Sequence, residues 1–217
     1  MNLSDKKILF LGDSITEGVG VSDPSNKYVN VFQRLSGAEV YNYGISGTRI
    51  AEKRTPTVDH LNFDRSFVSR VEEMDAEADA VVVFGGTNDF GHGDAPLGIF
   101  SDRDVYTFYG ALHTLILKLV NKYPTAKIVF MTPLHRLSED ITVSEIGLPR
   151  VRLIEYVRAI RNVCEFYSIP VLDLYRESGL QPRIPVIKEK FMPDGLHPSD
   201  AGAKIIAEKL YSFLQTI

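Results

Sequence analysis

The chain has 217 residues, 44% of them hydrophobic, and this is enough to form the buried core of one α/β domain. Its 24 basic and 28 acidic side chains give a formal net charge of −4, which argues against a general affinity for nucleic acid or an anionic membrane surface. A single cysteine, Cys164, excludes an internal disulfide and a multi-cysteine zinc site.

The first residues, Met1–Lys7, run directly into an apolar segment and lack the apolar core of roughly 7–15 residues that a signal peptide carries. No apolar stretch approaches the ~20 residues of a membrane-spanning helix. We therefore expect a cytoplasmic protein without membrane insertion. Because no linker or repeat interrupts the chain, we expect residues 1–217 to form a single domain.

Short apolar segments alternate with helical patterns along the chain. Five segments have the β-branched and aromatic composition typical of strands buried on both faces of a parallel sheet: Ile8–Leu11, Val40–Tyr43, Ala80–Phe84, Ile128–Met131 and Val171–Leu174. Apolar residues at three- and four-residue steps predict two helices, one through Val105, Phe108, Leu112, Leu115 and Leu119, and one through Leu153, Val157, Ile160, Cys164 and Tyr167. A last helix is predicted from about Ser199 to Leu214, with Ile206, Leu210 and Phe213 facing inward. The alternation predicts a doubly wound sheet with right-handed crossovers.

Four stretches are expected to be irregular and longer than most loops: Ile45–Asn62, Phe90–Asp104, His135–Leu148 and Gln181–Pro193. Long loops in a compact α/β domain are usually functional. Ligands of such a sheet bind beyond the carboxyl ends of its strands. Polar segments that follow the first, second, third and fifth predicted strands should therefore meet at one edge.

Ser14, Asp194 and His197 have the side chains and the chain order of a catalytic triad. A serine hydroxyl needs an adjacent base, and His197 would take its proton and later deliver it to the leaving alkoxide. Asp194 would hold the other imidazole nitrogen and fix the tautomer. The alternatives are a helix N-cap for Ser14, a surface turn for His197 and a simple Asp-Gly turn for Asp194. Metal binding by Asp194 and His197 is disfavoured, because no second histidine or carboxylate cluster accompanies them.

Gly47 and Asn88 are candidates for an oxyanion hole, with the backbone N–H of Ser14 as a third donor. Such donors stabilise the negative charge of a tetrahedral intermediate. Plain alternatives are a turn at Gly47 and a helix cap formed by Asn88 and Asp89. Gly44 competes with Gly47 for the oxyanion role.

Together these segments resemble the four blocks of the SGNH hydrolases, also called the GDSL family of esterases and lipases. They are Gly12-Asp13-Ser14-Ile15-Thr16, Gly44-Ile45-Ser46-Gly47-Thr48, Gly85-Gly86-Thr87-Asn88-Asp89 and Asp194-Gly195-Leu196-His197-Pro198. Ile15 stands where the family name has leucine. The resemblance implies a three-layer α/β/α flavodoxin-like fold with a five-stranded parallel sheet of order 2-1-3-4-5. It also implies no metal, and hydrolysis of esters, often of acetyl or other short acyl groups.

We predict a serine esterase that acts on a small-molecule carboxylic ester through an acyl-Ser14 intermediate and needs no cofactor. The Gly and short polar residues near the motifs favour a short acyl group, such as the acetyl ester of a carbohydrate. The alternatives are a lipid-directed hydrolase, either a lysophospholipase or a thioesterase, and a non-catalytic flavodoxin-like binding module. The absence of a Gly-x-x-x-x-Gly-Lys-Ser/Thr or Gly-x-Gly-x-x-Gly run argues against the module. Homo-oligomer formation and the natural substrate stay open.

Further candidates for substrate contact rest on position in the sequence alone: Asp13, Arg49, Phe90, His92 and Met192, with Phe191 beside them. Cys164 lies on the apolar stripe of its predicted helix, so we expect it to be a buried, inert thiol.

Overall fold

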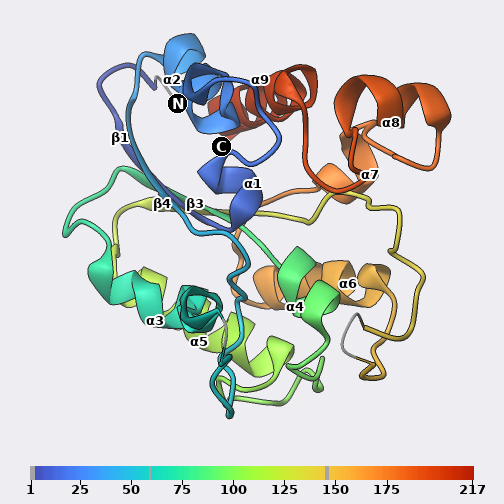
Figure 1. Ribbon diagram of the computed structural model, residues 1–217. Coiled ribbons are helices and arrows are strands. Elements are labelled where there is room, and N and C mark those ends of the chain that lie inside the picture. The colour runs from blue at the N-terminus through green and yellow to red at the C-terminus, as the bar shows by residue number, and fades with distance from the viewer. Residues whose placement is uncertain (1–2, 59, 145–146) are drawn as a thin grey trace.

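The computed structural model describes residues 3–58, 60–144 and 147–217. Within them, a five-stranded parallel sheet of order β2-β1-β3-β4-β5 lies between two layers of helices (Figure 1). The strands are β1 (Lys7–Gly12), β2 (Glu39–Gly44), β3 (Ala80–Phe84), β4 (Lys127–Met131) and β5 (Val171–Leu172). The predicted fold class and strand order are confirmed. Residues 59 and 145–146, in two of the expected loops, lie outside the described residues.

The helices divide between the two faces of the sheet. One layer holds α1 (Ser14–Glu17), α2 (Tyr28–Ser36), α7 (Leu174–Glu177), α8 (Pro185–Phe191) and α9 (Asp200–Thr216) (Figure 1). The other holds α3 (Phe67–Arg70), α4 (Thr87–His92), α5 (Phe108–Lys122) and α6 (Leu153–Phe166). Single 3-10 turns occur at Pro24–Asn26, Leu61–Asp64 and Val71–Glu73. No helix in the described part of the chain has the length and apolarity needed to cross a bilayer.

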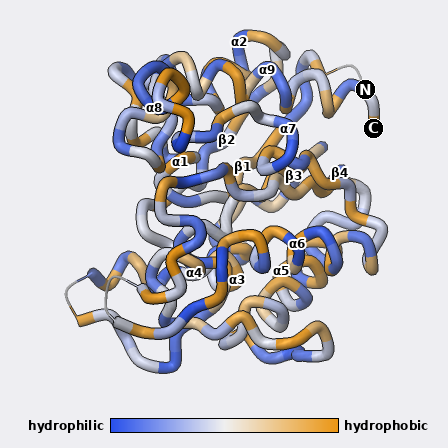
Figure 2. Tube along the Cα trace, turned by 90° about the vertical axis from the view of Figure 1, so that its right-hand side faces the viewer, coloured by the Kyte–Doolittle hydropathy of each residue, from blue (hydrophilic) through white to orange (hydrophobic). Residues whose placement is uncertain are grey.

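Alternate residues of the strands face the two helix layers, as the two-residue repeat of a strand requires. In β1, Leu9 and Leu11 pack in the core formed with α3, α5 and α6, whereas Ile8 and Phe10 pack in the core formed with α2 and α9. Both faces of the central strands are therefore buried, which explains their continuous apolar sequences. Figure 2 shows hydrophobic colour along β3 and β4, between the two layers.

The predicted inward faces of the long helices are largely confirmed. In α5 and α6 the apolar residues from Phe108 to Leu119 and from Leu153 to Cys164 that the spacing selects are fully buried. In α9, Ile206 and Leu210 are fully buried, and Phe213 packs against the same core while partly exposed. These helices thus cover the sheet with the apolar faces that the sequence predicts.

Three local expectations are wrong. The stretch Gln181–Pro193 contains α8, in which Pro185 occupies a first-turn position where its missing N–H costs nothing. The expected loop Phe90–Asp104 begins inside α4. The fifth strand ends at Leu172, because the Asp173 side chain accepts a hydrogen bond from the backbone N–H of Arg176 and starts α7.

The register of the sheet brings the polar segments together at its carboxyl edge. Gly12, the last residue of β1, is paired with Gly44 of β2 on one side and with Phe84 of β3 on the other. A Cβ atom at Gly44 would come within 2.2 Å of the backbone nitrogen of Glu17. Glycine at this position therefore allows α1 to lie directly against the end of β2.

Candidate active site

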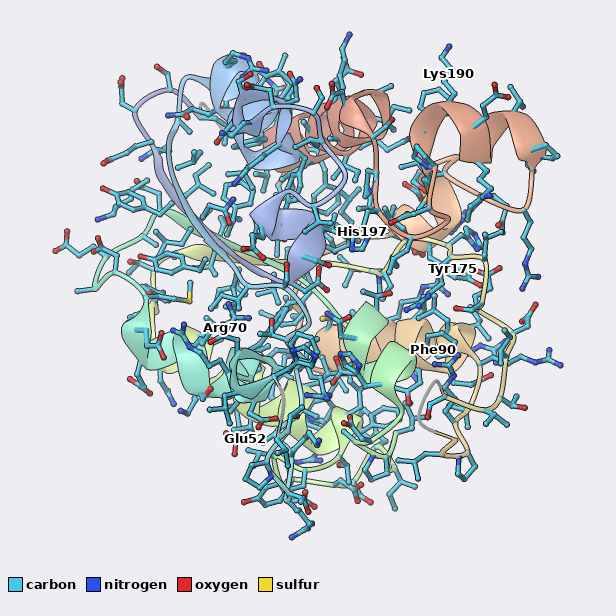
Figure 3. All side chains as sticks on the ribbon, in the orientation of Figure 1. Glu52, Arg70, Phe90, Tyr175, Lys190 and His197 are labelled. Carbon is cyan, nitrogen blue, oxygen red and sulfur yellow. The ribbon has the colours of Figure 1, made fainter. Side chains whose placement is uncertain are left out.

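Ser14, His197 and Asp194 form a hydrogen-bonded chain at the carboxyl edge of the sheet. Ser14 Oγ lies 2.9 Å from His197 Nε2, and His197 Nδ1 lies 2.6 Å from Asp194 Oδ2. Figure 3 places His197 beside α1, whose first residue is Ser14. A hydroxyl, an imidazole and a carboxylate in this order can transfer a proton from the hydroxyl to the imidazole.

The start of α1 presents the Ser14 hydroxyl. Asp13, and not Ser14, caps this helix, because Asp13 Oδ1 accepts a hydrogen bond from the backbone N–H of Ile15 at 3.0 Å. Ser14 is consequently free of a capping role, and its hydroxyl reaches His197. The residue is 7% exposed, so little of its surface contacts solvent.

A tight turn sets the geometry between Asp194 and His197. Gly195 has a φ of 79°, and Asp194 Oδ1 accepts the backbone N–H groups of Leu196 and His197 at 2.8 and 2.7 Å. Partial burial alone would raise the pKa of Asp194, but hydrogen bonds from the His197 side chain and from these backbone groups lower the pKa below its ordinary value. The carboxylate is therefore ionised and able to stabilise an imidazolium.

Gly47 and Asn88 follow β2 and β3, the two strands that flank β1 in the sheet. Asn88 Nδ2 donates one hydrogen bond to the carbonyl oxygen of Thr48 at 3.0 Å, and an amide nitrogen carries a second hydrogen. Gly47 has a φ of 75°, and a Cβ atom there would lie 2.0 Å from the Phe63 ring. The backbone N–H of Gly44 instead donates to Asn42 Oδ1 at 2.8 Å, which favours Gly47 as the oxyanion donor.

Two buried carboxyl groups, those of Asp13 and Asp89, lie in the motifs at the carboxyl edge of the sheet. Burial raises the pKa of Asp13 to about 7, although the nearby Arg70 guanidinium opposes the shift. Burial also raises the pKa of Asp89 to about 6, against the hydrogen bonds that its two oxygens accept from the backbone N–H groups of Ala51 and Ile50. Asp89 therefore ties the loop after Gly47 to α4 and does not cap a helix.

Most of the residues suggested for substrate contact have little accessible surface. Arg49 is 2% exposed and pairs with Asp94 at 2.7 Å, and Asp13 is likewise 2% exposed. Phe90 and Met192 have no exposed surface, and Phe90 packs between Tyr156 and the Arg150 guanidinium. These four side chains support the fold around the site, and none of them has enough exposed surface for us to propose that it binds substrate.

His92 is the most accessible of the suggested contacts. Its ring stacks on Phe63 at 5.2 Å, and His92 Nε2 lies 3.1 Å from the carbonyl oxygen of Gly47. Phe191 is partly buried against the core beneath α9. Cys164 is fully buried, and burial raises the pKa of its thiol, as expected for an inert cysteine.

Sequence reasoning missed Arg70 and Thr48, whose side chains form a hydrogen bond at 2.9 Å. Neither residue was singled out, since Arg70 lies in no recognised motif and Thr48 has no charge. Among the residues that the structure describes, no three His, Cys, Asp or Glu side chains are grouped so that they could hold a metal ion.

Comparison with known proteins gives the class. The profile of the GDSL-like Lipase/Acylhydrolase family matches residues 10–205, so the chain belongs to this family. The predicted resemblance is thereby confirmed, and it places the chain among hydrolases of the lipase and acylhydrolase class. No match was found among curated proteins.

Solved structures with the same fold align with nearly the whole chain. A protein from Lactobacillus plantarum is 34% identical, with a TM-score of 0.83 and 98% of each chain covered. A possible lipase from Chitinophaga pinensis is 23% identical, with a TM-score of 0.74 and 98% of each chain covered. The lipase/acylhydrolase from Enterococcus faecalis is 24% identical, with a TM-score of 0.65 and coverage of 97% of this chain and 96% of its own. At these lower identities the last two show the fold alone.

Proposed function

We propose that this protein is a serine esterase that hydrolyses carboxylic esters through an acyl-Ser14 intermediate. The observation that carries the proposal is the hydrogen-bonded chain from Ser14 through His197 to Asp194. A phosphate- or flavin-binding module on the same fold would have no need for such a chain. Membership of the lipase and acylhydrolase class agrees with this chemistry.

The first half of the reaction forms the acyl-enzyme. Ser14 Oγ attacks the ester carbonyl carbon while His197 Nε2 takes the hydroxyl proton, and the carbonyl electron pair moves to oxygen. When the tetrahedral intermediate collapses, the bond to the leaving oxygen breaks and His197 returns the proton to that oxygen. The alcohol departs, and the acyl group stays on Ser14.

The second half reverses these roles with water. His197 Nε2 takes a proton from water, whose oxygen attacks the acyl carbon. The bond to Ser14 Oγ then breaks, Ser14 regains its proton from His197, and the carboxylic acid is released. In both halves the oxyanion would accept hydrogen bonds from the N–H groups of Ser14 and Gly47 and from the Asn88 amide.

A short acyl group is the substrate we favour. Phe90, which directly follows the third motif, and Met192, which lies just before the fourth, are turned into the two cores and offer no surface to a long apolar chain.

One feature favours a longer acyl chain as the second candidate. A surface hollow of about 460 Å³ begins next to Gly47 and is lined by Glu17, Ile45, Ser46, Val58, His60, Leu61, Asn62 and Phe63. Val58 and Leu61 are 88% and 69% exposed. Such exposed apolar side chains beside the site would suit a lipid acyl chain.

Hydrolysis of p-nitrophenyl esters from acetyl to decanoyl tests both candidates. Wild type and Ser14→Ala are compared side by side, with thermal melting to show that both are folded. We expect activity that is highest with acetyl or butyryl esters and is lost in Ser14→Ala. A preference for decanoyl would select the lipid-directed hydrolase instead. Full activity in Ser14→Ala, or no turnover of any ester by folded wild type, would overturn the esterase proposal.

A further inference from the structure

Arg70, the last residue of α3, holds several main-chain segments at the catalytic edge. Its Nη2 donates to the carbonyl oxygen of Gly12 at 3.0 Å and to Thr48 Oγ1 at 2.9 Å. Its Nη1 donates to the carbonyl oxygen of Tyr43, and its Nε donates to that of Arg65 at 3.0 Å. The side chain lies in the layer of α3 (Figure 3), and the residue is 2% exposed.

These contacts join the nucleophile to the proposed oxyanion donors. Gly12 ends β1 two residues before Ser14, and Thr48 directly follows Gly47. Thr48 is fully buried, and its carbonyl oxygen is the acceptor for Asn88 Nδ2. One guanidinium therefore fixes the end of β1 and the peptide segment from which Gly47 and Asn88 take their positions.

The chemistry of the contacts requires arginine. The bound atoms are three carbonyl oxygens and a hydroxyl, none of them charged, and they surround a planar fork of N–H donors. Lysine could keep the charge but not bind the separate segments at once. Burial lowers the pKa of Arg70 to about 10, with the buried Asp13 opposing the shift, so the group is charged at neutral pH.

We propose that Arg70 is a positioning residue for the oxyanion hole, holding Gly47 and Asn88 at the distance from Ser14 that the tetrahedral intermediate needs. This inference rests on the proposed esterase function. A positioning role affects the transition state more than substrate binding, because small displacements of oxyanion donors matter most where charge develops.

The kinetic test compares Arg70→Met, Arg70→Lys and Thr48→Val with wild type. For Arg70→Met we expect kcat to fall about 10²-fold, the order of loss that a displacement of about 1 Å causes, with KM nearly unchanged. Arg70→Lys should fall between wild type and Arg70→Met. Thr48→Val keeps the shape of the side chain, removes its bonds to Arg70 and Ile45, and should lower kcat by a smaller factor.

Lys122→Met provides the matched control. Lys122 Nζ also binds main-chain carbonyl oxygens, those of Val71 and Met74 at 2.7 and 2.8 Å, in the segment that follows Arg70. It is the last residue of α5, and its Nζ donates to carbonyl oxygens of the segment Val71–Met74, which lies apart in sequence from Gly12 and Thr48. Its loss should lower the melting temperature and leave kcat unchanged.

A boronic acid separates positioning from general damage to the fold. An alkylboronic acid forms a tetrahedral adduct with a serine nucleophile and places an oxygen where the oxyanion develops. If Arg70 positions the donors, the affinity of Arg70→Met for the boronic acid should be lower than that of wild type by the same factor as kcat. Amide hydrogen exchange across Gly44–Arg49 should accelerate in this variant. Unchanged kcat, boronate affinity and exchange in a folded Arg70→Met would overturn the inference.

Failure of the esterase proposal gives a different result. In that case wild type itself hydrolyses no ester and binds no boronic acid at Ser14, and the inference falls with the proposal. If wild type is active, Ser14→Ala is inactive and Arg70→Met behaves as wild type, only the role of Arg70 is overturned.

Discussion

The proposed chemistry depends on a hydroxyl and an amide hydrogen that the hydrogen bonds of the fold leave available. Asp13 takes the capping role at α1 and so frees the Ser14 hydroxyl for His197. The Asn88 amide donates one hydrogen bond to the carbonyl oxygen of Thr48 and has a second hydrogen that it can donate to an oxyanion. The Asn88 amide and the buried Asp13 carboxyl can each be tested by substitution.

Replacing Asn88 tests the oxyanion hole. We expect Asn88→Ala to lower kcat by about 10²–10³-fold, because one preorganised donor to the developing charge is lost. Asn30→Ala is a suitable control, since Asn30 lies on α2 and its Nδ2 donates a hydrogen bond to the carbonyl oxygen of Pro24 at 2.7 Å. Wild-type activity in a folded Asn88→Ala would remove Asn88 from the site.

Asp13 gives a prediction for stability against pH. The folded protein holds the Asp13 proton more tightly than the unfolded chain, so the carboxyl stabilises the fold at low pH and loses this contribution as the pH rises through about 7. Asp13→Asn keeps a capping oxygen and cannot ionise. Its free energy of unfolding should therefore exceed that of wild type at about pH 8, by a few kcal/mol at most, and the difference should shrink toward about pH 4.

Asp23→Asn is the control of opposite sign. Hydrogen bonds from the Ser25 side chain and backbone lower the pKa of Asp23, so this carboxylate stabilises the fold at neutral pH and loses the contribution as the pH falls. Denaturant unfolding of the three proteins across pH measures both effects. A constant difference between Asp13→Asn and wild type at every pH would contradict the buried, proton-binding Asp13.

Among the elements, the segment that follows α1 contacts the start of α9. Asp200, the first residue of α9, accepts hydrogen bonds from Ser22 N at 2.8 Å, from Ser22 Oγ at 2.5 Å and from Asn26 Nδ2 at 3.0 Å. A Cβ atom at Gly20 would lie 2.7 Å from the carbonyl oxygen of Pro198, so the loop after α1 runs close against the residue that follows His197. This contact helps to hold the nucleophile and the base together.

Removing the Asp200 carboxylate tests the contact between the segment after α1 and the start of α9. Asp200→Ala should lower both the melting temperature and kcat at neutral pH, whereas Glu208→Ala on the same helix, which breaks an exposed pair with Lys204, should change neither. Hydrogen bonds from Ser22 lower the pKa of Asp200, so the stability difference from wild type should diminish in acid. Equal melting temperatures of Asp200→Ala and wild type at neutral pH would contradict the role of this contact.

The elements also show what the sequence could and could not predict. The strands were predictable because burial on both faces demands continuous apolar runs, and α5, α6 and α9 because one face of each is apolar. The helix α8 was missed because Pro185 suggested a loop, although proline suits the first turn of a helix. Phe90 and Met192 adjoin functional segments in the sequence but face the cores, because nearness in sequence does not determine which way a side chain points.

At the scale of the whole molecule, the parallel sheet explains why the triad members can lie so far apart in the chain. The order β2-β1-β3-β4-β5 puts the ends of β1, β2 and β3 side by side, and the segment before α9 returns to the same edge. The four motifs predicted this convergence. Arg70, which joins two of these strand ends, became apparent only when the tertiary contacts were known.

The esterase proposal requires that Ser14 carries the acyl group, and peptide mass spectrometry can locate this group. The protein is mixed with p-nitrophenyl acetate, quenched in acid during turnover and digested, and the position of the acetyl group is mapped. We predict an acetyl adduct on the peptide that contains Ser14, and no adduct with Ser14→Ala. An adduct on another residue, or ester hydrolysis by Ser14→Ala at the wild-type rate, would contradict the account.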